Sequence, residues 1–271
     1  MLSYAAMCAL STRQQSILNR VIETHIETML PVGSKAITAI FQELYRGSYS
    51  SATIRNEMMI LEGQGYLTHP HTSAGRIPTD RGYRYYVDQT LEDTRSKPNN
   101  DLIPEESLGG LMPASVFFAD RISQILSQLT KQISVMLAPA PDANAQASGS
   151  EYQLFFSGAS YVLDQPEFRN ARKIKALIEF LEEKRQFTDW MVECQSENKV
   201  CITIGAENKP RALHDLAMIS MPVLMGDRVG IIAVLGPKRM RYPNSIQRLG
   251  YMKSVIEEIW DKKKREFLKY E

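Results

Sequence analysis

The sequence predicts an α+β protein with two domains, and three observations support this. Helical and strand-like segments follow one another along 271 residues, a length that suits two domains of ordinary size. A polar stretch, Asp93–Asp101, has the composition of a linker. Residues 50–87 contain, one after another, the signals for a capped helix, a glycine that ends it, two short strands around a polar tip, and a new helix. That order predicts an N-terminal winged helix-turn-helix.

The domain organisation follows from composition along the chain. Residues 1–95 form the first predicted domain, 96–114 the linker and 115–271 the second domain. The second domain is interrupted at 138–150, where no Val, Ile, Leu or aromatic residue occurs. We expect a flexible connector there, because such a segment buries too little apolar surface to order itself.

The overall composition indicates a folded, soluble protein of a reducing cytoplasm. Hydrophobic residues make up 44% of the chain and charged residues 23%. Cys8, Cys194 and Cys201 are far apart and never form a C-x-x-C pair, which argues against a disulfide framework or a zinc site. No apolar run has the length of a membrane span, and Met1–Leu10 lacks the features of a secretory signal. We therefore expect no membrane partner.

Three helices are predicted before the wing. Ser11 or Thr12 opens the first, Ser34 caps the second, and the third starts at Ser50 or Ser51. Residues at helical spacing mark the buried stripes: Leu18, Val21, Ile22, His25, Ile26 and Met29, then Ile37, Ile40, Phe41 and Leu44, then Ile54, Met58 and Leu61.

The outward face of the third helix carries the candidate DNA contacts. Ala52, Asn56 and Met59 point away from the core, with Thr53 and Arg55 beside them. Arg55 can form a bidentate pair with guanine and Asn56 with adenine. The hydroxyls at the helix N-terminus suit phosphate oxygens, and they belong to Ser50, Ser51 and Thr53. The alternative interpretation is that all of these are solvated surface residues.

The predicted wing consists of strands at Tyr66–His69 and Arg76–Pro78, joined by a polar tip. The tip supplies the hydroxyls of Thr72 and Ser73, and Arg76 could reach a phosphate or the minor groove. An ordinary polar hairpin is the competing interpretation. Thr79 is expected to cap the fourth helix, whose tyrosines, including Tyr83 and Tyr86, we assign to the core.

Two further groups of residues are candidate sites, Lys35 for an anion and His69 with His71 for a metal. Lys35, beside the cap residue Ser34, could hold a phosphate or be a plain surface lysine. His69 and His71 would share one side of a strand, but no third ligand stands at suitable spacing, so we expect no metal. No nucleophile with a base, phosphate-binding loop or dinucleotide fingerprint is present at usable spacing. We expect neither an enzyme nor a cofactor.

In the second domain a long amphipathic helix is predicted at Ser115–Leu137, with apolar residues from Phe118 to Met136 spaced by three or four. The remaining elements are helices at Ala171–Glu183, Arg185–Gln195 and Ser245–Glu266, and strands at Val200–Ile204, Leu216–Val223 and Arg228–Leu235. Gly226 and Gly230, around Asp227 and Arg228, indicate a hairpin turn into the last strand.

Several motifs give the chain a resemblance to a known family, the bacterial heat-inducible transcription repressor HrcA. They extend over nearly the whole chain apart from the N-terminal tail and the connector. The motifs are Pro31–Lys35, Ser50–Met58, His71–Asp80, Gly82–Arg84, Met136–Pro139, Leu163–Phe168 and Gly236–Tyr242.

The resemblance implies a repressor that binds double-stranded DNA at an inverted-repeat operator, the CIRCE element, upstream of chaperone operons. It also implies that the GroE chaperonin keeps the repressor active and that heat, by diverting GroE, relieves repression. The C-terminal part is then a GAF-like domain into which a dimerising domain is inserted. Two alternatives stay open: a winged-helix regulator that responds to a small molecule, and a protein-interaction module that does not touch DNA.

This sequence departs from the family pattern before Glu151, where the connector stands in place of the inserted domain. The resemblance implies a homodimer, but the usual dimerising insertion is absent. We therefore expect either a substitute contact, through Phe118 to Met136, or impaired repression, because an inverted repeat needs two recognition helices.

Overall fold

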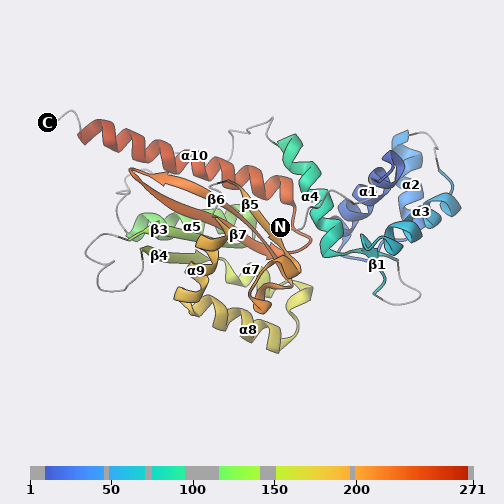
Figure 1. The fold of residues 1–271 in the computed structure, drawn as a ribbon, viewed down its shortest axis with the longest axis horizontal. Coiled ribbons are helices and arrows are strands. Elements are labelled where there is room, and N and C mark those ends of the chain that lie inside the picture. The colour runs from blue at the N-terminus through green and yellow to red at the C-terminus, as the bar shows by residue number, and fades with distance from the viewer. Residues whose placement is uncertain are drawn as a thin grey trace. The chain divides into compact units, whose positions relative to one another are not determined.

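The computed structural model describes residues 10–45, 49–70, 75–94, 116–140, 151–195 and 199–267. The chain divides into two compact units, Met1–Thr90 and Leu91–Glu271, and Figure 1 shows the elements of each. Within the described residues, no helix is both long and apolar enough to cross a membrane. The predicted linker, 96–114, lies outside the described residues.

The N-terminal unit has the element order of a winged helix-turn-helix, as predicted. Its strands pair antiparallel, with Leu67 opposite Pro78 and Thr68 opposite Ile77. The elements are α1 (Thr12–Thr28), α2 (Ser34–Tyr45), α3 (Ser51–Gly63), β1 (Leu67–Thr68), β2 (Ile77–Pro78) and α4 (Asp80–Thr94).

Capping residues set where these helices begin. Ser11 Oγ accepts a hydrogen bond from the Gln14 backbone N–H, and Gln14 Oε1 accepts one from the Ser11 backbone N–H, which completes a capping box before α1. Ser50 caps α3 by accepting from the Thr53 N–H. Thr79 Oγ1 accepts from the Gly82 N–H at 3.1 Å in the first turn of α4, so the predicted cap is confirmed.

Most residues of the predicted stripes in the first three helices are buried, but His25 of α1 and Ile40 of α2 are half-buried, and the side chain of Leu44 lies outside the described residues. Ile54, Met58 and Leu61 of α3 are fully buried. One member of the α1 stripe was predicted wrongly: Met29 is 50% exposed and adopts a left-handed conformation with φ 61°. Its N–H bonds to the carbonyl of His25, so Met29 ends the helix instead of continuing its apolar face.

The C-terminal unit is built on a five-stranded antiparallel sheet of order β4-β3-β7-β6-β5. Its strands are β3 (Ile133–Pro139), β4 (Tyr152–Ser157), β5 (Cys201–Ile204), β6 (Leu216–Met225) and β7 (Arg228–Pro237). Gly226, with φ 71°, forms the turn between β6 and β7 together with Asp227, which confirms the predicted hairpin.

Helices cover both faces of this sheet (Figure 1). They are α5 (Val116–Thr130), α7 (Ala159–Leu163), α8 (Ala171–Glu182), α9 (Lys184–Cys194) and α10 (Tyr242–Phe267). A 3-10 helix at Pro166–Phe168 lies between α7 and α8, and two more, Gly205–Glu207 and Arg211–Leu213, lie between β5 and β6. Ile133, Val135 and Leu137 of β3 share a core with α8 and α9, whereas α5 and α10 pack against each other and the sheet. Burial on both faces explains why β3 is apolar along its length apart from Ser134.

The predicted helix at Ser115–Leu137 is wrong beyond Thr130. Lys131 takes a left-handed conformation with φ 56°, and the chain turns into β3 at Ile133. Phe118 of α5 and Met136 of β3 are both fully buried inside the unit. The substitute dimer contact through Phe118 to Met136 is therefore excluded, because these side chains already form the core of one chain.

Only the first residues of the predicted connector, 138–140, lie within the described part of the chain. Ala138 and Pro139 belong to β3, paired with Gln153 and Tyr152, and 141–150 lies outside the described residues. The strand that follows, β4, was not predicted.

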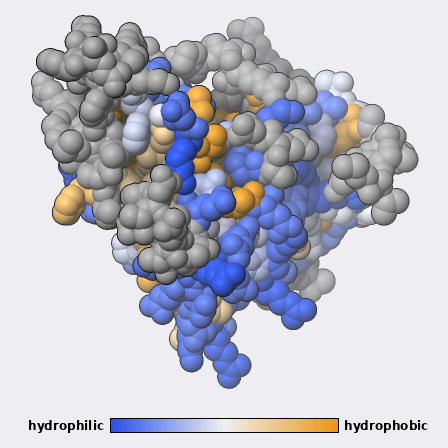
Figure 2. Space-filling model, turned by 60° about the vertical axis from the view of Figure 1, so that its left-hand side comes forward, coloured by the Kyte–Doolittle hydropathy of each residue, from blue (hydrophilic) through white to orange (hydrophobic). Residues whose placement is uncertain are grey.

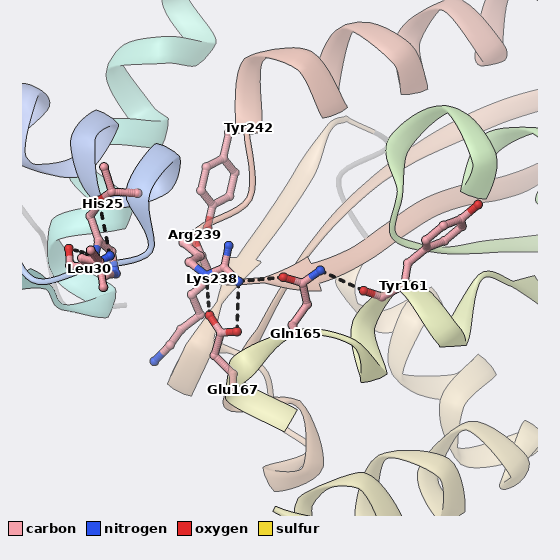
Figure 3. Close-up of polar contacts among 9 residues, drawn as sticks. His25, Leu30, Tyr161, Gln165, Glu167, Lys238, Arg239 and Tyr242 are labelled. Atoms are coloured by element: carbon pink, nitrogen blue, oxygen red, sulfur yellow. Dashed lines mark hydrogen bonds and ion pairs between the residues drawn. The ribbon is translucent and has the colours of Figure 1, made fainter. Parts of the chain in front are cut away.

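A polar cluster ties the Pro166–Phe168 turn to the end of β7, and Figure 3 shows it. Arg239, 8% exposed, donates from Nε to Glu167 Oε1 at 2.6 Å and from Nη2 to Gln165 Oε1 at 2.7 Å. Gln165 in turn donates to the Tyr161 carbonyl at 2.9 Å. These residues lie in or beside the Leu163–Phe168 and Gly236–Tyr242 motifs, so those motifs stabilise the C-terminal unit.

Candidate nucleic-acid interface

Helix α3 presents one face to the core and the other to solvent. Because Ile54, Met58 and Leu61 are buried, the residues between them point outward, and Ala52, Arg55, Asn56 and Met59 are all exposed. Within the described part of the chain, the side chains of Arg55 and Asn56 have no hydrogen-bond or ion-pair partner. The outward face therefore holds a guanidinium and an amide that are free to form bidentate pairs with bases.

The N-termini of α2 and α3 adjoin each other. Ser34 Oγ and Ser51 Oγ are 3.3 Å apart, and Lys35, next in the chain, is exposed. Ser50 Oγ accepts from the Thr53 N–H at 3.1 Å and lies 3.0 Å from Thr53 Oγ1. Two positive helix ends and a lysine thus lie at one place, an arrangement that favours an anionic ligand.

A buried carboxylate holds α3 in position. Glu57, only 6% exposed, binds Arg13 Nε at 2.7 Å and accepts from Gln14 Nε2 at 3.1 Å, so α3 is fixed to the start of α1. Our sequence analysis did not single out these three residues. The sequence does contain a signal for a buried carboxylate, because Glu57 lies three residues after Ile54 and so on the apolar side of the helix.

The wing is fastened to the segment before α2 as well as to itself. Val32 and Arg76 exchange backbone hydrogen bonds of 2.8 and 2.9 Å. At Gly75 the backbones approach so closely that a Cβ would meet the Val32 carbonyl carbon at 2.5 Å. Only glycine fits there without a shift of the backbone.

The Arg76 side chain is engaged within the unit. Its Nε donates to Glu62 Oε2 at 3.0 Å, and its side chain is 13% exposed. Glu62 also contacts His69 at the end of β1. The tip residues Thr72 and Ser73 lie outside the described residues.

The structure thus brings part of the predicted site together. Ser34, Lys35, Ser50, Ser51 and Thr53 cluster at two helix ends, and Arg55 and Asn56 lie on the outer face of α3 that begins there. Arg76 is instead bonded to Glu62 near the end of the same helix.

Metal binding and nucleophilic chemistry would depend, among the described residues, on His, Cys, Asp and Glu side chains. Among the described residues, no cluster of three or more His, Cys, Asp or Glu could hold a metal ion. A hydrogen bond to Cys201, together with burial, raises the pKa of Cys194 above that of an ordinary thiol. Cys194 is therefore a protonated thiol at neutral pH, which is a poor nucleophile.

Comparison with known proteins gives a consistent result. A family model described as the HrcA protein C terminal domain matches residues 142–246. Heat-inducible transcription repressor HrcA of Chlorobium chlorochromatii is 29% identical, with 90% of this chain and 95% of the relative covered. The protein of that name from Pelotomaculum thermopropionicum is 26% identical, with 93% and 97% covered.

A solved structure shares the fold. The crystal structure of a hypothetical protein superposes with a TM-score of 0.73 at 19% identity, covering 93% of this chain and 99% of that one. The alignment with the Chlorobium chlorochromatii protein runs over 339 residues, more than the 271 of this chain, so the relative contains residues without a counterpart here. Over about nine tenths of its length this chain is therefore similar to HrcA proteins, and the model of their C terminal domain covers part of the sheet-bearing unit.

Proposed function

We propose that this protein is a heat-inducible transcription repressor that binds double-stranded operator DNA through α3. The relatives carry the name of such repressors, and the winged helix-turn-helix is a fold that enters the major groove. The single observation that carries the proposal is the exposure of Arg55 and Asn56 on the outer face of α3, without partners among the described residues.

Arg55 and Asn56 read base edges, and the residues around them position the DNA backbone. Hydroxyls suit this role because in each of the pairs Ser34–Ser51 and Ser50–Thr53 one hydroxyl donates to the other, which leaves the second hydroxyl's hydrogen for a phosphate oxygen. The positioning residues are Ser34, Lys35, Ser50, Ser51, Thr53, Thr72, Ser73 and Arg76. Arg76 contributes to a phosphate contact only when its bond to Glu62 opens.

The similarity to HrcA repressors motivates a proposal for the biological setting. We propose an inverted-repeat operator of the CIRCE type upstream of chaperone operons, two copies of this chain on one operator, and the GroE chaperonin as the partner that keeps the repressor active. The protein acts in the cytoplasm, where bacterial DNA is read, and it is a binding protein and not an enzyme.

The test is a salt-titrated binding assay of the full chain with an inverted-repeat duplex and a shuffled duplex of equal length. Arg55→Ala is expected to cost about 1 to 3 kcal/mol on the inverted repeat and to reduce the preference over the shuffled duplex. Arg185→Ala removes an exposed arginine of α9 and serves as the matched control, which should bind like the parent.

Two results would overturn the proposal in different ways. If Arg55→Ala binds the inverted repeat and the shuffled duplex with the same affinities as the parent, α3 is not the element that reads the bases. The lack of salt-dependent binding to any duplex would favour the protein-interaction alternative, because phosphate contacts always release counterions.

A further inference from the structure

Cys201 lies on β5, the strand at one end of the C-terminal sheet, and its side chain is on the sheet face that α9 covers. It stands directly opposite Ser220 of β6. Directly opposed residues of an antiparallel pair share one face of the sheet. Met218 and Leu216, two and four residues before Ser220, belong to the core that α8 and α9 complete, so Ser220 and Cys201 lie on that face as well.

The end of α9 lies over the same place. Cys194 is the last residue of α9 and packs, half-buried, against the same core. Gln195 follows it, and its Oε1 accepts a hydrogen bond from Ser220 Oγ at 2.9 Å. The Gln195 amide also donates to the carbonyl of Lys199, two residues before Cys201. The end of α9 and the start of β5 are therefore side by side, each with a cysteine.

The two thiols are in contact, and the contact makes them unequal. The S–H of Cys194 donates a hydrogen bond to the sulfur of Cys201, and this bond, together with burial, raises the pKa of Cys194. A sulfur that accepts a hydrogen bond is stabilised as a thiolate, so Cys201 is the better nucleophile of the two. Both side chains are half-buried, so a small molecule in water can reach them.

We propose that Cys194 and Cys201 form a disulfide within one chain on reaction with a peroxide, with Cys201 as the attacking thiolate and Cys194 as the resolving thiol. The Cys201 sulfur attacks one oxygen of hydrogen peroxide and the O–O bond breaks, which gives a sulfenic acid and one water. The Cys194 sulfur then attacks the sulfenic sulfur, the S–O bond breaks, and the Cys194 proton leaves with the hydroxyl group as a second water. The sulfurs lose two electrons and the peroxide gains them.

Hydrogen peroxide is the class of oxidant that fits this place. It is small and uncharged, so it can reach half-buried sulfurs that are less accessible to a bulky disulfide. Figure 2 shows a face on which hydrophilic residues dominate and apolar ones gather in small patches, a surface that favours water-soluble reactants over apolar ones. The sulfurs need to move only from hydrogen-bond contact to bonding distance. Thiol reductants reverse such a bond, so it is transient wherever they are abundant.

The experiment treats the full chain with a small molar excess of hydrogen peroxide, blocks the remaining thiols with iodoacetamide and digests the protein with trypsin. The peptide 186–199, which contains Cys194, should be linked to the peptide 200–211, which contains Cys201, and dithiothreitol should release the link. Electrophoresis without reductant should show a single chain. Cys8→Ser removes the third cysteine of the sequence and is the matched control, which should form the link as the parent does.

Single substitutions separate the two roles. In Cys194→Ser the hydroxyl can still donate to the Cys201 sulfur but cannot resolve its sulfenic acid, which should persist and be trapped by dimedone. In Cys201→Ser the remaining thiol at Cys194 should be oxidised about tenfold more slowly than Cys201 is in Cys194→Ser, because Cys194 has the higher pKa.

Three results would overturn the proposal. In the first, peroxide modifies the parent but yields no link between the two peptides. In the second, either cysteine is linked to Cys8 instead of to the other. In the third, Cys194 in Cys201→Ser reacts as fast as Cys201 in Cys194→Ser, which would remove Cys201 as the attacking thiol. All of these measurements are made without DNA, so the proposed function fails or stands separately.

Discussion

Glu62 near the end of α3 binds Arg76 of the wing, with 3.0 Å between Oε2 and Nε. The carboxylate thereby ties the wing to the helix proposed to read the operator. It also neutralises the arginine that would otherwise be the cation at the base of the wing. The pair is partly exposed, 27% for Glu62 and 13% for Arg76, so a phosphate can compete with Glu62 for the guanidinium.

Glu62→Gln is therefore expected to release Arg76 toward the DNA. The slope of log affinity against log salt should steepen by about one unit, because one more phosphate is neutralised. The measurement is a salt titration with the inverted-repeat duplex, with circular dichroism to check that the helices remain. The double variant Glu62→Gln/Arg76→Ala is the control and should lose the added slope. A slope in Glu62→Gln equal to that of the parent would show that Arg76 does not reach a phosphate.

Removal of the buried carboxylate at Glu57 should destabilise the N-terminal unit. Glu57→Ala leaves Arg13 and Gln14 without their acceptor and frees α3 from α1, at an expected cost of about 1 to 3 kcal/mol. Denaturant unfolding followed by far-ultraviolet circular dichroism measures it. Glu43→Ala removes an exposed glutamate of α2 and should change stability by less than about 0.5 kcal/mol. Equal stability of the two variants would contradict the anchoring role of Glu57.

The N-terminal unit was largely predictable because its signals are local. Ile54, Met58 and Leu61 recur at helical spacing with one face buried, and the glycines and short strands that follow mark the wing. The same locality explains what was missed. The ties of Glu57 to Arg13 and of Glu62 to Arg76 join residues 44 and 14 positions apart, and spacing along a single element contains no information about such pairs.

The β3 region shows where periodicity misleads. Ile133 and Met136 continue the three-to-four spacing of α5, so the apolar pattern alone extends the helix. In the structure residues 133–138 are buried on both faces of a strand, which removes the alternation that identifies a half-exposed strand. The left-handed conformation at this turn is adopted by Lys131 and not by a glycine or an asparagine, so the sequence contains no signal that predicts it.

Gly75 permits the close contact between the wing and the segment before α2. In Gly75→Ala the added Cβ would lie 2.5 and 2.6 Å from the carbonyl carbon and oxygen of Val32, so the backbone hydrogen bonds between Val32 and Arg76 must shift. We expect a loss of about 1 to 3 kcal/mol in stability and weaker operator binding. Gly33→Ala, where a Cβ meets no atom within 4 Å, is the matched control. Parent-like unfolding and binding by Gly75→Ala would refute this close approach.

Glu167 compensates the charge of Arg239 in the C-terminal unit, and Glu167→Gln should destabilise that unit alone. Arg239 is 8% exposed and Glu167 30%, so the loss of the carboxylate should cost about 1 to 3 kcal/mol, less than for a fully buried pair. Both tryptophans of the chain, Trp190 and Trp260, lie in this unit, so fluorescence during denaturant unfolding reports it specifically. Glu179→Gln, which breaks the exposed pair with Lys175, should leave the midpoint within error. A midpoint for Glu167→Gln no lower than that of Glu179→Gln would show that the Arg239 cluster does not stabilise the unit.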